Sequence, residues 1–336
     1  MLIMFLLPIV FPGYVNGKIK QWTNNAITGE LNFSKVRLSF FNHFPSLTLT
    51  LYDASLKGSA PFQKDTLVAG KEIALGVNLT SLFGKAVTID EVYITDAKLN
   101  VLVDKEGKPN YNIYNSTTGK TKKETDTSSA SLKLKRIQID NCSLNYDDRS
   151  IPFLLSAHRL DYVGKGDLSK AVFDLTSHIK MEGLIVSYDK QAYLENKKID
   201  AQLITKINTS SLSFLFEDNN VEINKLPLEF KGRLDFLKNG YDMDLRFNTH
   251  ETDFQNLFTA LPPAFVTWIE KRKVKGDMIM DGSLTGKYIV KENIAPSVVL
   301  NMKVDDGYFS SKKAKEPARN FFFDFHFKMP SLVQIV

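Results

Sequence analysis

Residues 226–247 read LPLEFKGRLDFLKNGYDMDLRF, and apolar side chains fall on alternate positions before and after Asn239-Gly240. An alternation with a period of two is typical of a β-strand with one buried face. The Asn-Gly pair is typical of a two-residue hairpin turn. The stretch therefore predicts a β-hairpin with one continuous apolar face.

The turn also predicts how the two strands of this hairpin pair. A turn centred on Asn239-Gly240 sets Phe236 opposite Met243. It also sets Arg233 opposite Arg246, and oppositely charged diagonal neighbours offset the repulsion between the two guanidinium groups.

The same alternation recurs along most of the chain, which predicts a mainly β fold built as one long antiparallel sheet over residues 30–336. Apolar residues of one parity within each strand are the candidates for its apolar face. They are Leu47, Leu49, Leu51, Leu99, Val101, Val103, Leu228, Phe230, Leu234, Phe236, Met243, Leu245, Phe247, Met278, Met280, Phe321, Phe323, Phe325 and Phe327.

Two segments have helical spacing instead. Residues 13–29 carry an apolar stripe that ends at Gly29, which predicts an amphipathic helix. Residues 253–270 predict a short internal helix, with Thr252 or Asp253 as its N-cap and a break at Pro262-Pro263. Residues 115–131, rich in Ser, Thr and Lys, predict a flexible loop.

The N-terminal residues 1–12 are almost wholly apolar and predict a partial transmembrane anchor. An eleven-residue helix reaches only ~17 Å, against a hydrocarbon core of ~30 Å. A signal-peptide core is the alternative, but residues 14–21 contain no Ala-x-Ala-like cleavage site. The anchor residues are Leu2, Ile3, Phe5, Leu6, Leu7, Ile9, Val10 and Phe11.

The ends of the sequence lead to two further expectations. Lys18 and Lys20 follow the apolar run, which by the positive-inside rule keeps the bulk of the chain in the cytoplasm. A basic leader before Met1 would reverse that orientation, and we expect in-frame coding sequence there. We also expect more chain after Val336, because the apolar run at 321–327 would otherwise be an aggregation-prone edge.

Composition argues against catalysis and against nucleic-acid binding. The 336 residues carry a net charge of only +5, and the basic residues are scattered. The five histidines share no metal-ligand spacing, and the sequence lacks nucleophile-elbow, phosphate-loop and dinucleotide-binding motifs. Cys142, the single cysteine, reads as a small buried apolar residue. We therefore expect no enzyme, no cofactor and no metal.

Several segments together resemble the N-terminal region of the AsmA family of Gram-negative envelope proteins. After the apolar start and the amphipathic helix, the resemblance rests on residues 29–33, 39–49, 103–113, 261–262, 275–276 and 282–286. Tyr111 stands where the family more often has Trp. The short anchor and the missing C-terminal part are further departures.

The family is similar to the chorein-related, bridge-like lipid transfer proteins. This resemblance implies a strongly curved sheet whose concave apolar face forms a repeating groove for lipid tails. It also implies a single-pass anchor in the inner membrane, a periplasmic body, and transport of glycerophospholipid toward the outer membrane. The expected partners are membrane phospholipids and outer-membrane proteins or their assembly factors.

Three other readings of the pattern stay open at this point. The apolar face could be the core of a closed β-sandwich, because most alternating strands belong to sandwiches or barrels. The protein could instead be a scaffold that binds outer-membrane clients at its sheet edge. A glycan-binding or hydrolytic β protein is the third alternative.

Overall fold

The computed structural model describes residues 29–39, 47–77, 88–113, 131–263, 265, 269, 272–313 and 315–331. The predicted anchor at 1–12, nearly all of the predicted helix at 13–29 and the loop at 115–130 lie outside these residues. The chain divides into two compact units, Met1–Ser169 and Lys170–Val336.

The prediction of a mainly β protein is confirmed, because the strands form a 16-stranded sheet that is not closed. In the first unit, the hydrogen-bonded order is β1-β3-β4-β5-β6-β7, and β2 pairs with β3. These strands are β1 (Leu31–Asn32), β2 (Lys35–Ser39), β3 (Leu47–Lys57), β4 (Thr66–Val77), β5 (Thr88–Val103), β6 (Ser131–Asp148) and β7 (Phe153–Lys165).

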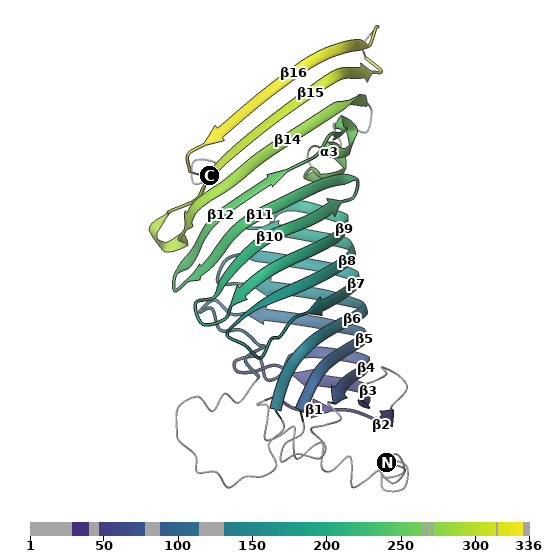
Figure 1. Cartoon of the computed structure of the whole chain (residues 1–336), viewed down its shortest axis with the longest axis vertical. Coiled ribbons are helices and arrows are strands. Elements are labelled where there is room, and N and C mark those ends of the chain that lie inside the picture. Colours follow the sequence, from purple (N-terminus) through teal and green to yellow (C-terminus); the bar gives the residue numbers. More distant parts are fainter. Residues whose placement is uncertain are drawn as a thin grey trace. The chain divides into compact units, whose positions relative to one another are not determined.

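The second unit has the strand order β8-β9-β10-β11-β12-β14-β15-β16, with β13 paired to β14. Its strands lie side by side in chain order (Figure 1). Its elements are β8 (Val172–Tyr188), β9 (Gln191–Asn208), β10 (Ser213–Ile223), β11 (Leu226–Leu237), β12 (Gly240–Asn248), β13 (Thr252–Asp253), α3 (Phe254–Ala260), β14 (Arg272–Tyr288), the 3₁₀ turn η2 (Val290–Glu292), β15 (Ser297–Ser311) and β16 (Ala318–Met329).

The expectation of a purely antiparallel sheet is wrong at one place. Strands β5 and β6 are parallel, with Ile94 beside Ile139 and Leu99 beside Leu144. Parallel neighbours need a connection of a dozen residues or more. The segment between Val103 and Ser131 is long enough, so the stretch predicted as a loop lies within this crossover.

The predicted hairpin register is also wrong, although the predicted face is right. Phe236 pairs with Tyr241, and the turn residues are Lys238 and Asn239. Gly240 belongs to β12, where a Cβ atom would collide with the carbonyl oxygen of Tyr288. Because Gly240 is needed for this close approach, the turn lies one residue earlier than the Asn-Gly motif suggests.

The observed register gives the hairpin one directly opposed pair of opposite charges, although Asp235 faces Asp242 and Lys231 faces Arg246. Arg233 now faces Asp244, where the predicted register had set it against Arg246. The total shift is two residues, so every side chain stays on its predicted face.

The internal helix has one of the two predicted N-caps and the predicted break, and the described residues 263, 265 and 269 beyond the break are again helical. Asp253 is its N-cap, and the carboxylate accepts a hydrogen bond from the backbone N–H of Gln255 at 2.8 Å. The helix ends at Ala260, before Pro262, as a proline break requires. The remainder of the predicted helix falls partly outside the described residues.

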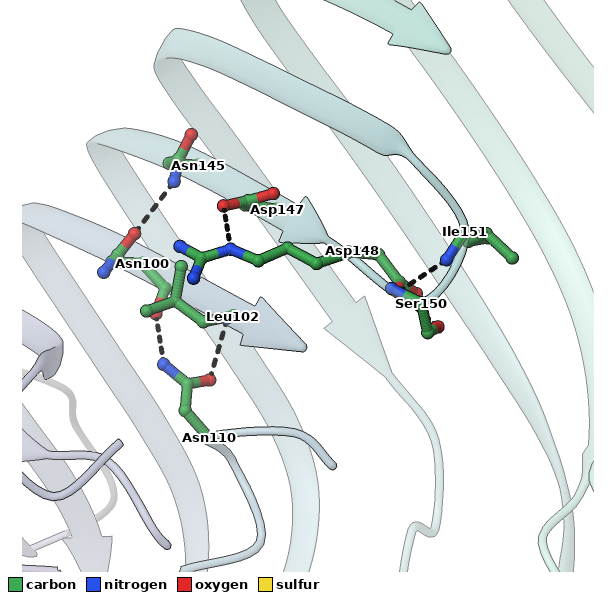
Figure 2. A network of polar contacts seen from close by, with 9 residues as sticks. Asn100, Leu102, Asn110, Asn145, Asp147, Asp148, Ser150 and Ile151 are labelled. Atoms are coloured by element: carbon green, nitrogen blue, oxygen red, sulfur yellow. Dashed lines mark hydrogen bonds and ion pairs between the residues drawn. The ribbon is translucent and has the colours of Figure 1, made fainter. Parts of the chain in front are cut away.

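A buried asparagine closes one end of the first unit (Figure 2). The Asn110 side chain is fully buried; its amide donates to the carbonyl of Asn100 at 2.7 Å. Its Oδ1 accepts from the backbone N–H of Leu102 at 3.0 Å. Asn145 donates to the Asn100 side chain at 2.8 Å, which links the neighbouring strand. Amide hydrogen bonds therefore fix the turn after β5 to β5, and fix β5 to β6.

We expect Asn110→Ala to lower the free energy of unfolding by about 2–3 kcal/mol, because it removes the partner of the buried Leu102 N–H and of the partly buried Asn100 carbonyl. The exposed neighbour Asn112 provides the matched control, and Asn112→Ala should change stability by less than ~0.5 kcal/mol. Urea unfolding of both variants measures the difference. Equal shifts would show that the Asn110 hydrogen bonds do not stabilise the fold.

Candidate functional site

Strand register in the second unit brings most predicted face residues onto one surface, which we call the apolar face. Phe230 pairs with Phe247 and Leu234 with Met243. The same side continues across β12, β14, β15 and β16 through directly paired positions. The residues of this face on β11 to β16 are Leu226, Leu228, Phe230, Leu234, Phe236, Tyr241, Met243, Leu245, Phe247, Met278, Met280, Leu284, Tyr288, Val298, Leu300, Met302, Val304, Phe323, Phe325, Phe327 and Met329.

Aromatic contacts confirm that these side chains share a surface. The ring centroids of Phe214 and Phe236 are 5.4 Å apart, and those of Phe236 and Tyr241 are 5.1 Å apart. On β16, the Phe325 ring stacks between Phe323 and Phe327, with centroid distances of 6.2 and 6.4 Å. Apolar contact is therefore continuous along and between strands.

Much of the apolar face is open to solvent. Phe236 is 41% exposed, Phe323 is 40% exposed, and Met243 and Leu245 are half-buried. In a β-sandwich, a second sheet would cover such positions and bury them. The partial exposure means that no described layer covers this part of the sheet.

Helix α3 covers the remaining part. Met278 and Val304 are fully buried and form a small core with Leu226 and Met280. Phe254, Leu257 and Ala260 of α3 pack against that core, and Figure 1 shows α3 beside β11 and β14. The apolar face therefore has a covered section below α3 and an open section elsewhere.

A buried lysine holds the C-terminal end of α3. The Lys197 ammonium on β9 donates to the carbonyl of Thr259 at 2.8 Å, and Asn224 donates to the same oxygen at 2.7 Å. Burial lowers the pKa of Lys197 below its ordinary value, because desolvation disfavours the charged form. These donors satisfy a carbonyl that would otherwise be unpaired at the end of the helix.

The opposite face of the sheet in the second unit carries ion pairs on β8, β9 and β12. His178 and Lys180 contact Asp200 at 2.9 and 3.2 Å. Arg246 lies 3.7 Å from Asp244. These pairs are solvent-exposed and add little stability, but they keep this face hydrated. The sheet of this unit thus has one polar, hydrated face and one apolar face.

The predicted face residues of the first unit are placed differently. Leu47, Leu51 and Val103 are buried, whereas Leu49, Leu99 and Val101 are half-buried. The first half of β3 is buried on both faces, since Thr48 and Thr50 are also inaccessible. The open apolar surface that the structure describes is therefore clearest in the second unit.

Three polar residues in strands of the first unit have a positive φ that was not predicted from the sequence. Asp53, Asp96 and Asn141 have φ angles of 48°, 51° and 50° in β3, β5 and β6. Asp96 accepts from the Asn141 amide at 2.5 Å and from Lys71 at 3.2 Å, and these donors lower the pKa of Asp96. The signal was an Asp or Asn in mid-strand, since these residues tolerate positive φ.

Potential metal ligands are dispersed in the part of the chain that the structure describes. Among the described residues, no cluster of His, Cys, Asp and Glu could hold a metal ion. Burial raises the pKa of Cys142, whose sulfur accepts from the backbone N–H of Ala97 at 3.3 Å. A buried thiol of this kind is chemically inert.

An open sheet with one apolar and one ion-paired face defines a β-groove protein. The sequence model of the AsmA family matches residues 1–261, and the chain belongs to this family. A comparison with curated proteins gave no match. The relation to chorein-type proteins is consistent with the family.

The prediction of a membrane anchor is not tested by the described residues. None of the helices in the described part of the chain is long and apolar enough to cross a bilayer. The predicted anchor residues at 1–12 are not among those described.

Proposed function

We propose that this protein carries glycerophospholipid along its apolar face toward the outer membrane and thereby supports outer-membrane biogenesis. In this proposal an N-terminal single-pass anchor holds the chain in the inner membrane, and the bulk of the chain lies in the periplasm. The partners are membrane phospholipids, and no catalytic step or cofactor is involved. Membership of the AsmA family supports the proposal.

The observation that carries the proposal is the partial exposure of the apolar face. Each CH₂ group left in water costs about 0.8 kcal/mol, so a sixteen-carbon tail costs roughly 12 kcal/mol to expose. Half-buried side chains such as Met243, Leu245 and Phe247 offer a surface that could cover such a tail. The opposite face of the sheet, which is exposed and charged, would stay in contact with water.

The proposal predicts that lipid contacts one face of the sheet. A photo-crosslinking residue at Phe236 or Leu245 should capture phospholipid when the full chain is purified from membranes. The same residue at Asp235 or Asp244, one position away on the opposite face, should capture little or none. Mass spectrometry of the adducts identifies the lipid. Equal capture at both faces would contradict a lipid path along the apolar face.

One observation favours a second candidate function, that of a scaffold for outer-membrane proteins. Among the described strands β16 pairs only with β15, so its other edge has free backbone groups. Phe322 on the polar side of β16 is 64% exposed. A β-rich client could add a strand there. Client pull-down with β16 variants tests this alternative.

A further inference from the structure

Two tyrosines from distant strands meet within the second unit. The hydroxyl oxygens of Tyr188, at the end of β8, and Tyr288, at the end of β14, are 2.7 Å apart. Four strands, β9 to β12, separate β8 from β14 in the hydrogen-bonded order. In a flat sheet those two strands would be about 24 Å apart. The contact therefore requires the sheet of this unit to curl, so that the β8–β9 hairpin approaches β14.

The bend that allows this approach lies within the hairpin itself. Gly183 on β8 and Asn196 on β9 have φ angles of 59° and 51°. The pairing of β8 with β9 shifts between Met181 and Leu184 and again before Val186. Bulges of this type bend a strand and increase its twist. The hairpin end that carries Tyr188 is therefore redirected relative to the rest of β8.

Tyr288 belongs to the apolar face. It pairs directly with Tyr241, whose ring contacts Phe236. Burial raises the pKa of Tyr288 well above its ordinary value, so the phenol is neutral and donates or accepts a simple hydrogen bond. Tyr188 thus meets the apolar face at the end of β14.

We propose that the hydrogen bond between the Tyr188 and Tyr288 hydroxyls is a clasp across the open side of the apolar face. A two-chain lipid enters this unit from the side when that hydrogen bond breaks and the two tyrosines separate. The inference rests on the proposed lipid-carrying function. A contact between two neutral phenols is weak compared with the gain from covering acyl chains, so lipid can displace it. Tyrosine suits this position because its ring is apolar and its hydroxyl is polar.

A covalent clasp tests the proposal. The Tyr188→Cys, Tyr288→Cys double variant is joined by a flexible bismaleimide that spans the gap left by the two rings. Cys142 is 1% exposed and its thiol pKa is raised by burial, so it should not compete for the reagent. The full chain is then mixed with vesicles that contain phosphatidylethanolamine and phosphatidylglycerol with a fluorescent acyl chain.

We expect the crosslinked double variant to acquire lipid at least about tenfold more slowly than the same variant without crosslinker, because opening the clasp would be blocked. Each single variant treated with the reagent controls for modification alone. Tyr188→Phe removes only the hydrogen bond and should load roughly twofold to threefold faster than the unaltered chain.

The outcomes separate the clasp from the lipid-carrying function. Equal loading with and without crosslinker, while the unaltered chain also loads, overturns the clasp and leaves the proposed function standing. No loading by the unaltered chain overturns both. Slower loading of the crosslinked form alone supports the clasp.

Discussion

Leu245→Asp is expected to reduce phospholipid transfer by about tenfold or more while the protein stays folded. Leu245 is half-buried on the open section of the apolar face, between Gly232 and Leu284. A carboxylate there keeps its water, so the free energy of unfolding should fall by only about 1–2 kcal/mol. An acyl chain passing this point would have to desolvate the charge or leave the surface.

The matched control places a carboxylate on the opposite face. Lys231 is exposed, adjoins Gly232 and faces Arg246, so Lys231→Asp should leave both stability and transfer nearly unchanged. Transfer between labelled donor and acceptor vesicles gives the rate, and circular dichroism gives the fold. Unfolding of Leu245→Asp would indicate that Leu245 belongs to a closed core and not to a groove. Unchanged transfer would show that lipid does not travel along this face.

Met278→Asp is expected to do the opposite, destabilising the second unit by about 4 kcal/mol or more. Met278 lies on the same face as Leu245 but has no exposed surface, because α3 covers it. A charge at this position would be buried without a partner. The two substitutions therefore distinguish the covered section of the apolar face from the open one.

The adjacent residue Ile279 is the control for this second experiment. It is 52% exposed on the polar face and pairs with Lys303, so Ile279→Asp should change stability by less than ~0.5 kcal/mol. Urea unfolding followed by circular dichroism compares the two variants. Similar stability of Met278→Asp and Ile279→Asp would show that α3 does not seal this part of the sheet.

Several features of the fold could be predicted because they depend on local pattern. Period-two alternation in β11 and β12 placed Leu234, Phe236 and Met243 on one face, and the structure agrees. Asp253 was identifiable as a helix cap from its position before an apolar helical stripe. The face on which a strand residue lies and the residue that caps a helix both depend on near neighbours in the chain. Both can therefore be predicted from the order of residues alone.

Other features depended on contacts between distant residues. The hairpin register depends on Gly240 beneath the carbonyl of Tyr288, which is supplied by another strand. The parallel pairing of β5 with β6 depends on which strands become neighbours after a long crossover. Neither contact produces a periodic pattern in the sequence of the strands whose pairing it determines.

The sequence by itself determined that this protein is a sheet with one apolar and one polar face, because strand geometry converts alternating residues directly into two surfaces. Only the tertiary structure decided which part of the apolar face is covered. Helix α3 seals Met278 but leaves Leu245 half-exposed, although both were equivalent candidates by parity. The contact of Tyr188 with Tyr288 likewise appears only after the sheet curls, since coverage and closure depend on three-dimensional neighbours and not on sequence spacing.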